Sequence, residues 1–79
     1  MDFFEKDLKI DLIVTLFKHQ DLKIEVYSSL NGPYVDIHYK KQFNTYSFPD
    51  IVQASSFANS LISSYLVDEE FIEIFLNDL

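Results

Sequence analysis

The segment LKIEVYSSLNGPYVDIHY, residues 22–39, decides the fold of this chain. Apolar residues alternate with polar ones in its first part, which is the period of two of a strand with one buried face. Asn31-Gly32 follows, and this dipeptide is the strongest short-range signal for a β-hairpin. Because Pro33 lacks the amide N–H that would close a two-residue turn, we expect a four-residue loop over residues 30–33.

That loop predicts a register for the hairpin. Counted outward from the loop, Val26 lies opposite Ile37 and Glu25 lies opposite His38. The remaining expected pairs are Ser29 with Tyr34, Tyr27 with Asp36, and Ile24 with Tyr39. In this register the apolar residues of both strands share one face, and the agreement between turn and pattern favours the hairpin.

The residues before the hairpin favour another strand, over about 8–17. Apolar side chains occupy its even positions, and we expect this set to face inward: Leu8, Ile10, Leu12, Val14 and Leu16. A helix within residues 2–19 is the alternative, but the apolar side chains would then scatter around the helix without a clean face. The polar residues 18–21 end this strand. After the hairpin, Lys40-Lys41-Gln42 turns the chain into a short strand over 43–48.

The second half of the chain has the pattern of two helices, over about 49–66 and 68–78. Ser47-Phe48-Pro49-Asp50 is typical of a helix start, with a Ser cap and a proline in the first turn. Apolar residues fill one arc of the longer helix: Ile51, Ala54, Phe57, Ala58, Leu61, Ile62, Tyr65 and Leu66. The opposite face has only Ser, Asn and Gln, so it either packs on the last helix, a second copy or a partner, or is a tolerant surface. We expect Asp68 to cap the last helix.

Together these elements predict one small α+β domain over residues 1–79. Its expected architecture is an antiparallel three- or four-stranded meander followed by two C-terminal helices packed on one face. The expected strands are 8–17, 22–30, 34–41 and 43–48. A chain of this length buries only roughly 60–65% of its unfolded surface. The core has no disulfide to assist it, but 48% of the residues are hydrophobic, including eight Phe and five Tyr.

The charge of the chain excludes several classes of partner. The formal net charge is −7 and all six basic residues are Lys, so the chain lacks the basic footprint that nucleic acids and anionic membranes require. It also lacks arginine, the usual phosphate clamp. The acidic first residues do not resemble a secretory signal, and we expect a cytoplasmic protein of a bacterial host. Abundant Phe, Ile, Lys, Tyr and Asn fit an AT-rich genome of a bacterium, its phages or its mobile elements.

Signals for catalysis are weak. The absence of Cys and the single Gly exclude a thiol nucleophile and a glycine-rich phosphate loop. The most reactive-looking cluster is on the polar face of the third strand, where Asp36 and His38 lie near Glu25. One His–carboxylate pair lacks a nucleophile, a third ligand and a pocket, so a charge pair on a solvated face is the simpler interpretation. We therefore expect no enzyme, no cofactor and no metal, and a metal- or ligand-binding enzyme centred on these residues is the distant alternative.

Residues 68–79, DEEFIEIFLNDL, give the strongest functional signal. They include five acids and no base, and so hold −5 of the net −7. On a helical wheel their apolar side chains span roughly 200°, more than one docking face needs. A terminal helix with a solvated acidic back explains this pattern as well as a partner-docking helix does. If the helix docks, the expected interface residues are Asp68, Glu69, Glu70, Phe71, Glu73, Phe75 and Leu79.

The sequence therefore favours a non-enzymatic, acidic interaction protein. We expect it to bind and block a nucleic-acid-handling protein with a basic surface, by occlusion or by partial mimicry of nucleic acid. Small acidic α+β inhibitors encoded by phages, such as anti-CRISPRs, have a similar general profile, as do some antitoxins, and this similarity is of type and not of sequence. The alternative is a structural subunit or a homodimer that closes through the uncharged helix face.

Overall fold

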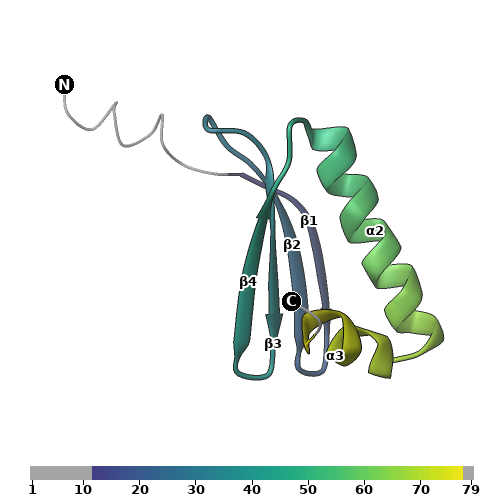
Figure 1. Cartoon of the computed structure of the whole chain (residues 1–79). Coiled ribbons are helices and arrows are strands. Elements are labelled where there is room, and N and C mark those ends of the chain that lie inside the picture. Colours follow the sequence, from purple (N-terminus) through teal and green to yellow (C-terminus); the bar gives the residue numbers. More distant parts are fainter. Residues whose placement is uncertain (1–11, 78–79) are drawn as a thin grey trace.

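Four strands and two helices make up residues 12–77, the part of the chain that the computed structural model describes. In chain order they are β1 Leu12–His19, β2 Leu22–Ser28, β3 Tyr34–Tyr39, β4 Gln42–Ser47, α2 Ile51–Val67 and α3 Glu70–Asn77. The strands form one antiparallel sheet in the order β1-β2-β3-β4, and both helices pack on the same face of it (Figure 1). The predicted α+β meander is confirmed, with four strands.

The core lies on the helix-covered face, which we define as the face of the sheet that α2 and α3 pack on. The central strands contribute five side chains with no exposed surface: Leu22, Ile24, Val26, Val35 and Ile37. The helices add six more buried residues: Ala54, Ala58, Leu61, Tyr65, Ile72 and Leu76. Because full burial of a Val, Leu or Ile side chain contributes about 1.5–3 kcal/mol, β2 and β3 with the two helices supply most of the stability.

The hairpin between β2 and β3 forms, but its predicted register is wrong by two residues. Glu25 lies opposite Asp36, and not opposite His38. The loop is longer than expected because a turn closes at Gly32, whose amide N–H donates to the Ser29 carbonyl at 3.0 Å. Gly32 has a φ of 106°, a left-handed conformation that favours glycine. Since a shift of two residues preserves the faces of a strand, the buried face is as expected while the cross-strand partners are not.

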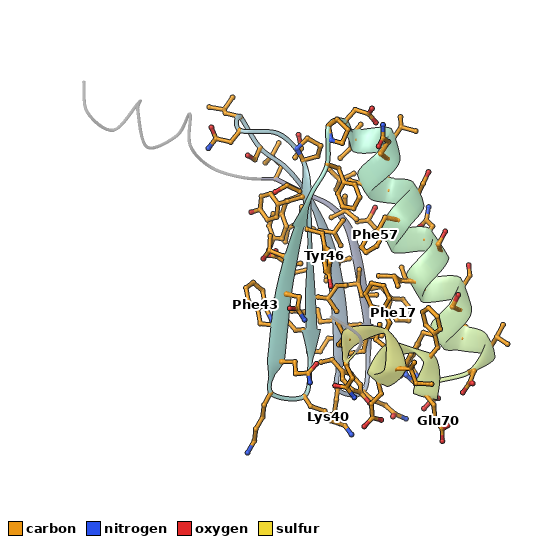
Figure 2. The ribbon with its side chains drawn as sticks, viewed as in Figure 1. Phe17, Lys40, Phe43, Tyr46, Phe57 and Glu70 are labelled. Atoms are coloured by element: carbon orange, nitrogen blue, oxygen red, sulfur yellow. The ribbon has the colours of Figure 1, made fainter. Side chains whose placement is uncertain are left out.

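β1 is a strand and not the alternative helix, but its predicted orientation is wrong. Leu12, Val14 and Leu16 were expected inward, and each is more than half exposed. Phe17 lies between the sheet and the helices instead (Figure 2), with its ring edge-on to Tyr65 at a centroid distance of 6.1 Å. The register of β1 against β2 shifts at Val14, which interrupts the alternation of the strand. The beginning of the predicted strand, before residue 12, lies outside the described residues.

Asp50 begins α2. Its Oδ1 accepts the amide N–H of Gln53 at 2.9 Å, and its extended backbone is that of an N-cap residue. The predicted cap at Ser47 is therefore wrong, because Ser47 is the last residue of β4 and pairs with Tyr34 in the sheet. The helix consequently begins two residues later than expected, at Ile51.

Two-residue turns join β1 to β2 and β3 to β4. Each opens on a residue in the left-handed region, Gln20 with a φ of 53° and Lys40 with a φ of 54°, where side chains other than glycine are uncommon. The Lys40 amide N–H donates to the Asp21 carbonyl at 3.2 Å. The two turns therefore lie side by side at one end of the sheet (Figure 1).

Candidate functional site

Asp68 creates a corner between α2 and α3, where most of the predicted interface residues meet. Its backbone leaves the helical region, with φ −148° and ψ 105°, and this ends α2. Its Oδ1 accepts the amide N–H of Glu70 at 3.1 Å, which satisfies a free donor at the start of α3. The Phe71 amide N–H donates to the Asp68 carbonyl at 3.0 Å. The predicted capping role of Asp68 is confirmed.

Acidic and apolar side chains are exposed together at this corner. We name as the acidic corner the exposed residues Leu66, Val67, Asp68, Glu69, Glu70, Glu73 and Ile74. Val67 is 89% exposed and Leu66 63%, and Figure 2 shows Glu70 directed away from the sheet. A shallow, open depression adjoins the corner, and it is lined by Ser63, Ser64, Val67, Asp68 and Phe71. The corner therefore combines carboxylates, apolar surface and a concave surface in one place.

Most of the apolar arc of α3 is used inside the domain. Ile72 and Leu76 are buried in the core, while Phe71 and Phe75 are half-buried against it. The Phe75 ring lies 6.1 Å from the ring of Phe57, so Phe75 belongs to the aromatic cluster under α2. Leu79, also predicted at the interface, lies outside the described residues. Among the apolar residues of α3, Ile74 presents the exposed surface.

The charges of the described residues are unevenly distributed. No residue from 42 to 77 is basic, so the carboxylates of the acidic corner have no opposite charge on their own helices. The lysines of the described part all belong to the strands and turns of the sheet: Lys18, Lys23, Lys40 and Lys41. Burial raises the pKa of the Tyr65 hydroxyl, and the negative charge of Glu69 raises it further. The acidic corner, where α2 meets α3, therefore presents negative charge to the solvent.

The polar face of α2 is solvent-exposed and has no charged residue. Its exposed members are Gln53, Ser56, Asn59, Ser60 and Ser63. α3 packs against α2, yet all five of these residues remain exposed. Of the explanations that the sequence leaves for it, cover by the last helix is therefore wrong for these five residues.

The side of the sheet opposite the helices has a second polar cluster. We name this side of the sheet the open face. Its residues include Leu16, Lys23, Glu25, Tyr27, Tyr34, Asp36, His38, Phe43 and Thr45. Phe43 points away from the helices on this side (Figure 2). Glu25, at the centre of the open face, is only 6% exposed. Its Oε1 lies 3.4 Å from Nε2 of His38 and 3.8 Å from Nζ of Lys23.

The sequence identified the acids of the corner but not its apolar part. Leu66 was assigned to the buried arc of α2, and this is wrong because the neighbouring Tyr65 takes the inward position. A hydrogen bond of 2.8 Å between the Tyr65 hydroxyl and Nδ1 of His19 holds Tyr65 there. Adjacent large residues point about 100° apart on a helix, and this was the available signal that one of the two would be exposed.

Comparison of the chain with protein-family models, with curated proteins and with solved structures finds no match in any of the three. Within residues 12–77, neither helix has the length and apolar character needed to cross a membrane.

Proposed function

We propose that this protein is a non-enzymatic interaction domain that binds a basic surface of another protein through the acidic corner. The supporting observation is the combination found there: exposed carboxylates at Asp68, Glu69 and Glu70, no base between residues 42 and 77, and exposed apolar side chains beside a shallow depression. Opposite charges steer two proteins together, while apolar contacts at the centre of an interface supply most of the affinity.

The expected partner is a protein that handles nucleic acid. Such proteins present basic surfaces to the phosphate backbone, and these surfaces are complementary to the acidic corner in charge. A domain seated there excludes nucleic acid, so the proposed activity is inhibition. The four carboxylates of the corner are few for a mimic of a long phosphate backbone, and occlusion of the basic site is the simpler mechanism.

The proposal is tested with a purified partner and two matched variants. Tagged full-length protein captures candidates from a bacterial extract, and each candidate is then purified and titrated by calorimetry. Glu69→Gln with Glu70→Gln removes two carboxylates from the acidic corner. Asp21→Asn with Asp50→Asn removes two exposed carboxylates elsewhere, and Asn at position 50 still caps α2.

The corner variant should weaken binding by about 10-fold or more and reduce its dependence on salt. The control variant should stay within about 3-fold of the original protein. Equal losses in both variants, or binding that is indifferent to salt, would contradict the role of the corner. The bound protein should also displace nucleic acid from the partner, and a partner that retains its nucleic acid would contradict inhibition by occlusion.

A homodimer is the second candidate, and the uncharged face of α2 favours it. An exposed helix face without Lys or Glu loses the stabilising i,i+4 charge pairs of ordinary surface helices, and a symmetric contact between two copies would give this face a function. Light scattering should then report a dimer mass, and Ser60→Glu should reduce it to a monomer mass. A monomer mass for the original protein at high concentration would refute the dimer.

A further inference from the structure

Three ligand-type side chains meet at the centre of the open face. Glu25 on β2 lies directly opposite Asp36 on β3, and His38 follows Asp36 on the same face two residues later. One ligand atom from each of the three residues lies within 4.8 Å of the other two. The sequence already grouped these three residues but predicted that Glu25 lies opposite His38, whereas in the observed register Asp36 takes the position directly opposite Glu25.

The charges of this cluster are poorly balanced by the protein itself. Like charges directly opposite each other on two strands are destabilising, and Glu25 and Asp36 occupy such a pair. Glu25 is also almost fully buried, so its negative charge requires partners, and in the protein these are the Tyr27 hydroxyl, His38 and Lys23. The nearest ammonium group is that of Lys23, at 3.8 Å and on a side chain that is 39% exposed. A divalent cation between the two carboxylates would offset the repulsion between Glu25 and Asp36 and would also compensate the buried charge of Glu25.

Neighbouring hydroxyl groups orient the two carboxylates. The Tyr27 hydroxyl donates to Oε2 of Glu25 at 3.0 Å, which leaves Oε1 directed toward Nε2 of His38. The Thr45 hydroxyl donates to Oδ1 of Asp36 at 2.7 Å and leaves the second oxygen of Asp36 available. Hydrogen bonds of this kind fix metal ligands in place and raise metal affinity.

The spacing of the ligand atoms fits a first-row transition metal. Bonds of about 2.0–2.2 Å in a tetrahedral zinc site put neighbouring ligand atoms roughly 3.4 Å apart. Oε1 of Glu25 and Nε2 of His38 are already 3.4 Å apart, and a ligand oxygen of Asp36 lies within 4.8 Å of the ligand atoms of both residues. One imidazole nitrogen and two carboxylate oxygens are ligands that Zn²⁺ accepts. The Phe43 ring, 4.6 Å from the His38 ring, limits rotation of the imidazole.

We propose that Glu25, Asp36 and His38 form a binding site for a divalent transition metal ion, with Zn²⁺ as the reference ion. The three side chains supply three ligands from two adjacent strands, and two of them, Asp36 and His38, are partly exposed on the open face. The site is independent of the acidic corner, which is at the C-terminal end of α2 and on the other side of the sheet (Figure 1). Either proposal can therefore fail without affecting the other.

The test is a titration of the full-length, metal-free protein with ZnCl₂, followed by calorimetry. The expected result is saturable binding of one ion per chain, and Asp36→Asn and His38→Gln should each weaken it about 10-fold or more. Thr45→Val, which removes only the hydrogen bond to Asp36, should also weaken it by about 10-fold. Glu25→Gln alters a buried residue, so Asp36 and His38, which are partly exposed, are the primary positions, with circular dichroism to verify folding.

Two control variants separate this site from other acidic or histidine groups. His19→Gln removes the other histidine of the chain, and Glu69→Gln with Glu70→Gln removes exposed acids; both should bind Zn²⁺ within about 3-fold of the original protein. In nitrogen-15 NMR, Zn²⁺ should shift Nε2 of His38 and leave His19 unchanged. Absence of saturable binding, stoichiometric binding by the Glu25→Gln, Asp36→Asn, His38→Gln triple variant, or an equal loss in the controls would overturn the proposal.

Discussion

The helix-covered face and the open face belong to the same four strands, yet their side chains differ in kind. On the helix-covered face, Ile24 and Ile37 have no exposed surface. On the open face, Leu16 and Phe43 remain more than half exposed, and among the described residues of this face the acid Glu25 is deeply buried. Because successive strand residues point to opposite sides, one sequence encodes both surfaces. The comparison teaches that the core is built from one set of alternate positions, while the side chains of the other set make little contribution to it.

The largest expected effect tests this division directly. Ile37→Ala removes a fully buried side chain from the helix-covered face and should lower the free energy of unfolding by about 3–4 kcal/mol. Leu16→Ala shortens an exposed side chain on the open face and should cost less than about 1 kcal/mol. Urea denaturation of both variants measures the difference. Similar costs would mean that the open face is covered in the native protein.

Between the sheet and the helices, two tyrosines, Tyr46 on β4 and Tyr65 on α2, should respond in opposite directions when their hydroxyl groups are removed. The Tyr46 hydroxyl is buried and has no hydrogen-bond partner among the described residues, so Tyr46→Phe should stabilise the protein by about 1 kcal/mol. The Tyr65 hydroxyl is bonded to His19, and Tyr65→Phe should destabilise it by about 1 kcal/mol. Thermal unfolding of the two variants gives the comparison. A loss of stability in Tyr46→Phe would indicate a partner for that hydroxyl.

The same tyrosines should make the stability of the protein sensitive to alkaline pH. Burial raises the pKa of both hydroxyl groups above the ordinary value of 10.0. Above that value the unfolded chain releases these protons while the folded chain retains them, so stability falls as the pH rises through the folded-state pKa. Urea denaturation below and above the folded-state pKa should show this loss of stability. The Tyr46→Phe variant should lose less stability over the same pH range. An unchanged pH dependence in that variant would contradict the assignment to Tyr46.

The smallest expected effect concerns the turns, which belong to neither face. Asn tolerates the left-handed conformation of Gln20 better than Gln does, so Gln20→Asn should stabilise the protein by about 0.5 kcal/mol. Lys40→Asn relieves the same conformation but loses the contact of the Lys40 ammonium with the Tyr39 ring at 5.2 Å, so its net effect should be close to zero. Chemical denaturation at high precision distinguishes them, and a larger gain in Lys40→Asn would contradict this account.

Local patterns were sufficient for the fold class. Alternation in residues 22–26, the Asn31-Gly32 signal and the long apolar arc of 51–66 lead to a meander with helices on one face, and each is a property of neighbouring residues. The orientation of β1 was not predictable in the same way. This edge strand has apolar residues on both sides, Leu16 on one and Phe17 on the other, and only packing against Tyr65 decides between them.

The candidate sites differed in how much the sequence disclosed. The acids of the acidic corner and the cap at Asp68 follow from composition and helix signals. The exposure of Leu66 depends on how Tyr65 packs, which is a tertiary property. The cluster on the open face depends on the hairpin register, and the turn that ends at Gly32 moved that register by two residues. The residues that lie opposite each other on two strands can therefore be predicted only when the length of the connecting loop is predicted correctly.

The strand order β1-β2-β3-β4 has a consequence for how the chain reaches its native state. Every strand pairs with the strand next to it in sequence, and the connections are short. Loop closure therefore has a small entropic cost, and a low mean sequence separation between contacting residues is associated with rapid folding. The sheet can assemble hairpin by hairpin before the helices dock. We therefore expect this small β-rich domain to fold faster than sandwiches or barrels, whose strands pair across distant parts of the sequence.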